Sequence, residues 1–289
     1  MAENITDSIS DFFTDLGASL KTAVKLALQS RHTNLGGALA APGALYIMGN
    51  GPSLRSNLDN DLDFLRTHTT LAVNFAANSD AFRLVRPAYY VLADPHFFSG
   101  TADPNVRSLH EALGSVDWQM TLFIPASVAP GWLPAGNRHL RVERFNFVGA
   151  EGFEWLEDIV YDKAMAMPRP RNVLIPSIMI GIWLGYKEIY LMGADHSWLQ
   201  SIWVDDDNRV VTVQPHFYAD NDKEKQRVRS EYAGHRLHDV LESFHIAFRS
   251  YHRIARYAAS RGVEIYNATP GSFIDAFPRR QLPQNNSSL

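Results

Sequence analysis

One stretch of the sequence, Ala-Leu-Tyr-Ile-Met-Gly-Asn-Gly-Pro-Ser-Leu at 44–54, restricts the possible folds most strongly. Residues 45–48 form a short apolar run, which is typical of a strand buried on both faces of a parallel sheet. Gly49 and Gly51 allow a tight turn and a close approach of a ligand to the backbone, and Pro52 suits a first helical turn. The stretch predicts a strand, a turn and a helix start whose N–H groups point at a phosphate or another anion.

The turn has an ordinary and a functional interpretation. Glycine-containing turns between a strand and a helix also occur without a ligand. Asn50, between the two glycines, favours the functional interpretation because its side-chain amide both donates and accepts hydrogen bonds. The first candidate binding residues are therefore Gly49, Asn50, Gly51 and Ser53.

The composition restricts the class of protein. The chain of 289 residues is 46% hydrophobic and 20% charged, which is typical of a folded protein, and no apolar run is long enough to cross a bilayer. A net charge of −4 gives no indication of a nucleic-acid partner. The absence of cysteine excludes disulfides and thiolate chemistry. The start of the sequence has no basic and apolar secretion signal, so the expected location is the cytoplasm, with a peripheral place at the inner membrane face as an alternative.

Further strands and helices alternate along the chain. Short apolar runs predict strands at 69–74, 88–93, 120–125, 187–193 and 263–267, and apolar periodicity predicts helices at 58–66, 175–184 and 235–261. This alternation predicts an α/β fold with a Rossmann-like, mostly parallel sheet flanked by helices.

The sequence predicts that the chain consists of three segments. Residues 1–43 form an amphipathic helix over Ile5–Leu28, with Thr6 or Asp7 as a cap, followed by a linker. Residues 44–280 form the Rossmann-like domain, with a lid at about 198–234, and residues 281–289 form a disordered tail. The apolar side of the helix packs on its own domain, on a second subunit of a homo-oligomer, or on a membrane surface, although its aspartates suit anionic lipid poorly.

Polar residues end several predicted strands. Asn50, Asn74 and Asp94 follow successive strands and should meet at one edge of the sheet, where ligands of parallel sheets bind. Capping of the following helices is the ordinary interpretation of Asn74 and Asp94. The aspartates at 205–207 suggest either a metal site or a solvated hairpin tip, and the hairpin tip is the simpler interpretation.

The order of these pieces resembles the bacterial CMP-sialic-acid-dependent lipooligosaccharide sialyltransferases. The resemblance rests mainly on Gly-Asn-Gly-Pro-Ser-Leu at 49–54 and Leu-Gly-Tyr-Lys-Glu-Ile-Tyr-Leu at 184–191, with Tyr-Ala-Gly-His at 232–235. Where that family has Asn-Pro-Ser, this chain has Asp94-Pro95-His96. The MptE-like proteins, related to a 6-hydroxymethylpterin diphosphokinase, share the same skeleton.

The sialyltransferase resemblance implies transfer of a nonulosonic sugar from a CMP-activated donor to a surface-glycan acceptor, with inversion and without a metal or cofactor. It implies that His235 is the general base, a role that suits a pKa near neutrality. The implied donor-binding residues are, besides the first turn, Asn74, Asp94, Ser177, Asp195, His196 and Ser197, with His216 and Tyr218 from the lid.

Two other function classes stay open. The MptE-like resemblance implies an Mg²⁺-dependent pyrophosphoryl transfer, with Asp94 and Asp195 holding the ion against ATP. A non-catalytic nucleotide-binding protein of glycan synthesis is the third hypothesis. The three differ in whether a sugar nucleotide is consumed and whether a metal is needed.

Overall fold

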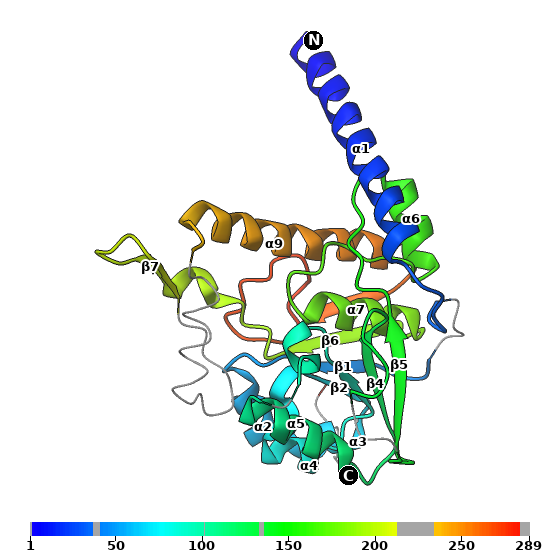
Figure 1. Ribbon diagram of the computed structural model, residues 1–289, viewed down its shortest axis with the longest axis vertical. Helices are drawn as coiled ribbons and strands as arrows, with labels where there is room; N and C mark the ends of the chain where they lie inside the picture. The colour runs from blue at the N-terminus through cyan, green and yellow to red at the C-terminus, as the bar shows by residue number, and fades with distance from the viewer. Residues whose placement is uncertain (1, 37–40, 101, 133–135, 213–233, 284–289) are drawn as a thin grey trace.

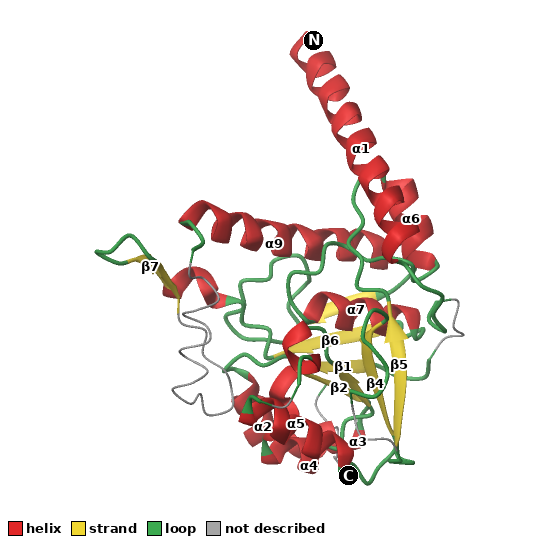
Figure 2. Cartoon of the chain, in the orientation of Figure 1, coloured by secondary structure: helices red, strands yellow, loops and turns green. Residues whose placement is uncertain are grey.

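A computed structural model describes residues 2–36, 41–100, 102–132, 136–212 and 234–283. The described chain forms a seven-stranded sheet with helices on both faces, and a long N-terminal helix projects from this body (Figures 1 and 2). The α/β fold with a Rossmann-like parallel sheet that the sequence predicts is confirmed.

The strands of the large sheet are β1 (Leu45–Met48), β2 (Thr70–Val73), β3 (Tyr89–Val91), β4 (Met120–Pro125), β5 (Leu140–Phe145), β6 (Glu188–Met192) and β9 (Glu264–Asn267). The helices are α1 (Ala2–Gln29), α2 (Leu54–Asn60), α3 (Leu62–Thr67), α4 (Asp80–Val85), α5 (Pro104–Gly114), α6 (Glu154–Asp162), α7 (Leu174–Trp183) and α9 (Leu237–Ser260). A separate antiparallel hairpin consists of β7 (Ile202–Val204) and β8 (Val210–Thr212).

The strand order of the sheet is β5-β4-β3-β2-β1-β6-β9, and every neighbouring pair is parallel. The chain proceeds outward from β1 to β5 and then returns to place β6 on the other side of β1. The direction of winding therefore reverses between β1 and β6. In open parallel sheets, ligands bind at the carboxyl ends of the strands beside such a reversal.

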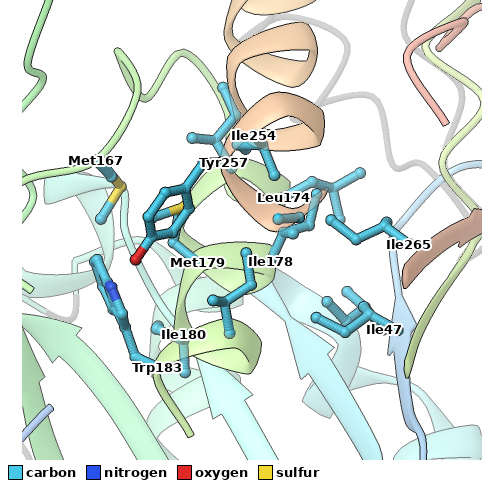
Figure 3. Close-up of a cluster of buried hydrophobic side chains, with 14 of the residues drawn as sticks. Ile47, Met167, Leu174, Ile178, Met179, Ile180, Trp183, Ile254, Tyr257 and Ile265 are labelled. Carbon is cyan, nitrogen blue, oxygen red and sulfur yellow. The ribbon is translucent and has the colours of Figure 1, made fainter. Parts of the chain in front are cut away.

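The strands are apolar on both faces because a helical layer covers each face. Leu45 and Ile47 point into the core under α7 and α9, whereas Tyr46 and Met48 point into the core over α2 to α5. Figure 3 shows the first core, where Trp183 of α7 lies close to Met167 and to Tyr257 of α9. The prediction that β1 is buried on both sides is confirmed, since all its residues are buried.

The structure corrects several predicted boundaries. The helix predicted at 58–66 is two short helices, α2 and α3, which meet at Asp61. Helix α1 begins at Ala2, so Thr6 and Asp7 lie within it rather than at its start. The sequence also misses β5, an edge strand whose charged and half-exposed residues give no buried apolar run.

The predicted linker and lid are described only in part. Residues 37–40 of the linker, 213–233 of the lid and the end of the predicted tail lie outside the described residues. The described part of the lid contains the β7–β8 hairpin, and its tip holds Asp205, whose carboxylate accepts hydrogen bonds from the N–H groups of Asp207 and Arg209. The aspartates at 205–207 thus form a hairpin tip, as the simpler interpretation predicts. Among the described residues no helix is long and apolar enough to cross a membrane.

Candidate functional site

The candidate site is the corner after β1, where Gly49 to Ser53 pack against the end of β6. The N–H of Gly49 donates to Met192 O at 2.7 Å, and the N–H of Gly51 donates to Gly193 O at 2.8 Å. A Cβ on Gly49 would lie 2.5 Å from Gly193 O, which is closer than side-chain atoms approach a carbonyl. The glycines are therefore needed to bring the two strand ends together.

The carboxylate of Asp195 closes this corner from the side of β6. Its oxygens accept hydrogen bonds from the Ser53 N–H at 3.3 Å and from the Ser53 hydroxyl at 2.8 Å. A Cβ on Gly51 would lie 1.9 Å from Asp195 Oδ2, so only glycine leaves room for the carboxylate. The expectation of free N–H groups for a phosphate at the start of α2 is therefore wrong at Ser53, because a carboxylate of the protein already occupies that position.

The loop after β9 holds Asp195 in place. The Thr269 hydroxyl accepts from the N–H of Ala194 at 3.0 Å, and the Ser272 hydroxyl donates to Ala194 O at 2.6 Å. The N–H of Phe273 donates to Asp195 O at 2.9 Å. The end of β6 is thus bonded on one side to the loop after β9 and on the other side to the corner after β1.

Asn50 has buried polar atoms without a partner. Both its Nδ2 and its Oδ1 are shielded from solvent, and neither has a hydrogen-bond partner within the described chain. An unsatisfied buried donor or acceptor costs about 1–3 kcal/mol, so folded proteins rarely keep such atoms without a reason. The amide requires a partner that both accepts and donates, such as a ribose hydroxyl or the edge of a base. A phosphate only accepts hydrogen bonds at neutral pH, so it would satisfy the Nδ2 donor of Asn50 but not its Oδ1 acceptor.

Asn50 and Asn74 follow the carboxyl ends of neighbouring parallel strands. Met48 of β1 pairs with Ala72 of β2, and each asparagine comes one or two residues after the last residue of its strand. Asn74 has a positive φ of 51° and begins a short 3₁₀ turn, and its carbonyl oxygen accepts from the Tyr90 hydroxyl. The expected meeting of these two amides at one edge of the sheet is consistent with the topology.

Asp94 lies at the same edge, at the end of β3, and caps the turn that follows. Its carboxylate accepts from the N–H of His96 at 2.8 Å, and the His96 ring is 2.9 Å from a carboxylate oxygen of Asp103. These contacts are those of the ordinary capping interpretation. Asp94 is exposed, so its remaining oxygen stays accessible to a ligand.

His196 is buried in a chain of side-chain hydrogen bonds that the sequence does not reveal. Its Nε2 is 2.7 Å from the Tyr251 hydroxyl of α9, which donates to Asn172 Oδ1 at 2.9 Å. Because the single hydroxyl proton goes to Asn172, the Nε2 of His196 carries the proton that Tyr251 accepts. Burial lowers the pKa of His196 to about 3, so the ring is neutral and does not supply positive charge to a phosphate.

Asn172 and Tyr251 are site residues that sequence reasoning misses. The N–H of Leu174 donates to Asn172 Oδ1 at 3.0 Å, so Asn172 caps the start of α7, and its buried Nδ2 has no partner among the described residues. Asn172 lies one position before the N-cap residue Val173, outside the helix that the sequence predicts at 175–184. Tyr251 belongs to the apolar side of α9, and nothing in the local sequence indicates that its hydroxyl meets His196.

Ser177 and Ser197 flank this chain of hydrogen bonds. Ser177 is fully buried in α7, and its hydroxyl donates to Val173 O at 2.7 Å, so no surface for a donor exists there in this conformation. Ser197 begins the 3₁₀ turn after His196 and is half-buried.

His235 lies in the segment that leads into α9. It is exposed and precedes α9, a helix of 24 residues. Tyr251, which contacts His196, follows Leu237 by 14 residues, or about 21 Å along the helix axis. The role of His235 as general base stays a prediction. His216 and Tyr218 lie outside the described residues.

Asp94 and Asp195 are too far apart to hold one Mg²⁺ ion between them. They end β3 and β6, between which β2 and β1 stand. Three strand spacings of about 4.8 Å separate them by about 14 Å, whereas two ligands about 2.1 Å from one Mg²⁺ lie within about 4 Å of each other. Among the described residues no group of three His, Asp or Glu side chains is arranged to hold a metal ion.

Comparisons with known proteins support the fold but do not assign the chain to a family. No protein-family model matches the chain, and no curated protein sequence matches it. A solved structure, the MAf glycosyltransferase from Magnetospirillum magneticum AMB-1, matches with a TM-score of 0.51 and 12% sequence identity. The match covers 91% of this chain but 38% of the other, so this chain spans well under half of the length of that protein. At this identity, the likeness establishes a shared fold.

Proposed function

We propose that this protein is a glycosyltransferase that binds a nucleotide-activated sugar over the corner between β1 and β6. The observation that carries the proposal is the buried Asn50 amide, which lacks a partner among the described residues at the place where the sheet reverses its winding. The shared fold with the MAf glycosyltransferase supports the class of reaction.

The chemistry of the corner favours the nucleoside part of the donor over its phosphate. Asp195 adds a negative charge beside Asn50, and a carboxylate repels a phosphate but accepts hydrogen bonds from ribose hydroxyls. The Asn50 amide supplies one donor and one acceptor to a hydroxyl or base edge. The proposal therefore places the ribose or the base over Asn50 and Asp195, with Asn74 alongside.

The donor in this proposal is a CMP-activated nonulosonic sugar, and the acceptor is a surface glycan. The resemblance of residues 49–54 and 184–191 to the sialyltransferase family supports this choice of donor. His235, which directly precedes α9, is the general base in this proposal.

Calorimetry with cytidine, CMP and inorganic phosphate tests the proposal on the full chain. We expect cytidine to bind within about tenfold of CMP and phosphate alone not to bind. Asn50→Ala should weaken cytidine and CMP binding equally, by tenfold or more, because a site that pairs buried polar groups loses that pairing. The control Asn60→Ala removes an exposed amide that bonds only within α2 and should leave binding unchanged.

Two results would overturn the proposal. Tight binding of inorganic phosphate with no binding of cytidine would place the phosphate at the corner. If no nucleotide binds at millimolar concentration, the corner is not the binding site of the sugar donor. A transfer assay with CMP-sialic acid then tests the reaction, and a His235→Ala variant with normal transfer would remove the assignment of the base.

A further inference from the structure

A backbone N–H fixes the direction of every hydrogen bond in the chain from Asn172 to His196. The N–H of Leu174 can only donate, and it lies 3.0 Å from Asn172 Oδ1, so this atom is the oxygen of the amide. The Tyr251 hydroxyl lies 2.9 Å from the same oxygen and donates its single proton there. The hydroxyl oxygen therefore accepts from His196 Nε2, 2.7 Å away, and that nitrogen carries a hydrogen.

The other ring nitrogen of His196 then has a lone pair and no hydrogen. A neutral imidazole carries one hydrogen, so protonation at Nε2 leaves Nδ1 as an acceptor. No hydrogen bond joins Nδ1 to a residue of the described chain, and Nδ1 is not among the partnerless polar atoms that this part of the chain seals from solvent. The structure thus presents one unused acceptor on a ring that is otherwise about nine-tenths buried.

Three aromatic side chains hold the ring in this orientation. The ring centroid of His196 lies 4.1 Å from that of Trp198, 5.5 Å from that of Tyr251 and 6.4 Å from that of Phe248. Burial also lowers the pKa of His196 to about 3, so the ring stays neutral at physiological pH. The acceptor at Nδ1 is therefore held in one place and in one protonation state.

Asp195 and His196 flank the carboxyl end of β6. They are consecutive residues, so their Cα atoms lie about 3.8 Å apart, but their side chains bond to different elements. The Asp195 carboxylate bonds Ser53 before α2, and the His196 ring bonds Tyr251 of α9. A ligand over the end of β6 therefore lies between two groups that only accept hydrogen bonds.

A hydroxyl group is the ligand chemistry that fits such acceptors. A sugar hydroxyl is neutral and donates one hydrogen bond, whereas a phosphate at neutral pH offers no hydrogen to accept. We propose that His196 Nδ1 accepts a hydrogen bond from a hydroxyl of the bound nucleotide sugar, and that Asn172 and Tyr251 are positioning residues that keep Nδ1 free of hydrogen. The inference rests on the proposed function, because its ligand is the nucleotide sugar of that proposal.

Nitrogen-15 NMR of the His196 ring in the full chain tests the tautomer without any ligand. We expect the signal of an unprotonated nitrogen at Nδ1 and of a protonated one at Nε2, both assigned by their absence from His196→Gln. Tyr251→Phe removes the group that accepts from Nε2, so a mixture of the two tautomers should appear. Tyr257→Phe is the matched control, because Tyr257 is a buried tyrosine of the same helix whose hydroxyl bonds Asp162 instead. A protonated Nδ1 in the wild-type protein would overturn the inference and leave the proposed function intact.

Calorimetry with cytidine and CMP-sialic acid tests the ligand. Glutamine places its amide where Nε2 lies and keeps the bond to Tyr251, but it has no acceptor at the position of Nδ1. His196→Gln should therefore weaken CMP-sialic acid binding about tenfold. Asparagine places its amide oxygen near Nδ1 and tolerates the positive φ of this position, so His196→Asn should bind about threefold more tightly than His196→Gln. Tyr251→Phe should weaken binding about threefold, and Tyr257→Phe should leave it unchanged.

The two ligands show which hydroxyl is bound. An equal loss for cytidine and CMP-sialic acid in His196→Gln would assign the hydroxyl to the ribose, and a loss for CMP-sialic acid alone would assign it to the transferred sugar. If His196→Gln binds both ligands as tightly as the wild-type protein does, the inference is overturned and the proposed function stands. A wild-type protein that binds neither ligand would overturn the proposed function and the inference with it. Unchanged circular dichroism would show that the variants fold.

Discussion

The corner after β1 and the outer side of α1 both have binding capacity that the described chain does not use, but of opposite kinds. At the corner the unused groups are the two polar atoms of a single buried amide, Asn50, held between closely packed strand ends. On α1 the unused surface is apolar and extends along the helix from Ile9 to Leu28. A few buried polar atoms select a small polar ligand, whereas a broad apolar surface suits a macromolecular partner.

The two regions also differ in how they are held. Backbone and side-chain hydrogen bonds from the ends of β1, β6 and β9 fix the corner, so a small change there disturbs several elements. α1 is attached to residues 151–153 through Ser19 and Thr22. Substitutions at the corner should therefore cost folding stability, and substitutions on the outer side of α1 should leave it nearly unchanged.

Gly51→Ala should have the largest effect. Its Cβ would lie 1.9 Å from Asp195 Oδ2 and 2.7 Å from Gly193 O, and the backbone oxygen has no room to move away. We expect a loss of about 3 kcal/mol in the free energy of unfolding, together with the loss of CMP binding, measured by urea unfolding and calorimetry. Gly114→Ala is the matched control, since a Cβ there meets nothing within 4 Å. Equal stability of both variants would contradict the tight packing of the corner.

Burial of His196 should make the protein less stable in acid. Its pKa falls from 6.5 to about 3 on folding, so below pH 6.5 the unfolded chain binds a proton that the folded chain does not. The free energy of unfolding should then decrease by about 1.4 kcal/mol per pH unit as the pH falls from 6.5 toward 3. His196→Gln should remove this part of the slope, and the exposed His252→Gln should keep it. The same slope in wild type and His196→Gln would contradict the buried neutral ring.

Thr22→Val should loosen α1. Valine has nearly the shape of threonine but cannot bond the N–H and C=O of Glu151, so we expect a cost of about 1–2 kcal/mol for the attachment. Hydrogen exchange should become faster in the C-terminal half of α1 while the sheet keeps its protection. Thr14→Val is the control, because its hydroxyl bonds only within α1, to Ser10 O. Equal exchange in both variants would show that other contacts hold the helix.

Phe13→Ser should have the smallest effect on folding. The ring has an exposed fraction of 64%, so its loss should change the free energy of unfolding of the monomer by less than about 0.5 kcal/mol. Urea unfolding of the two proteins measures this difference. A large loss of monomer stability would mean that the outer side of α1 is not free and would remove the contrast with the corner.

The sequence by itself determined those elements whose signals are local. The apolar run of β1, the glycine turn after it, and the almost wholly apolar α7 ended by Gly185 can be read from neighbouring residues, because turns and helix ends depend on backbone conformation within a few positions. It also indicated correctly that Asn50 and Asn74 share one edge of the sheet. The edge strand β5 was missed, because an exposed edge needs no continuous apolar pattern.

Only the tertiary structure decided how the site is occupied and what it has left to bind. Asp195 meets Ser53 across 142 residues of sequence, and Tyr251 meets His196 across 55. Such contacts depend on strand order and helix packing, which leave no periodic signal in the chain. The tertiary structure likewise turned the polar side of α1 toward the body, because Ser19 and Thr22 find backbone partners at residues 151–153 that the helix sequence does not contain.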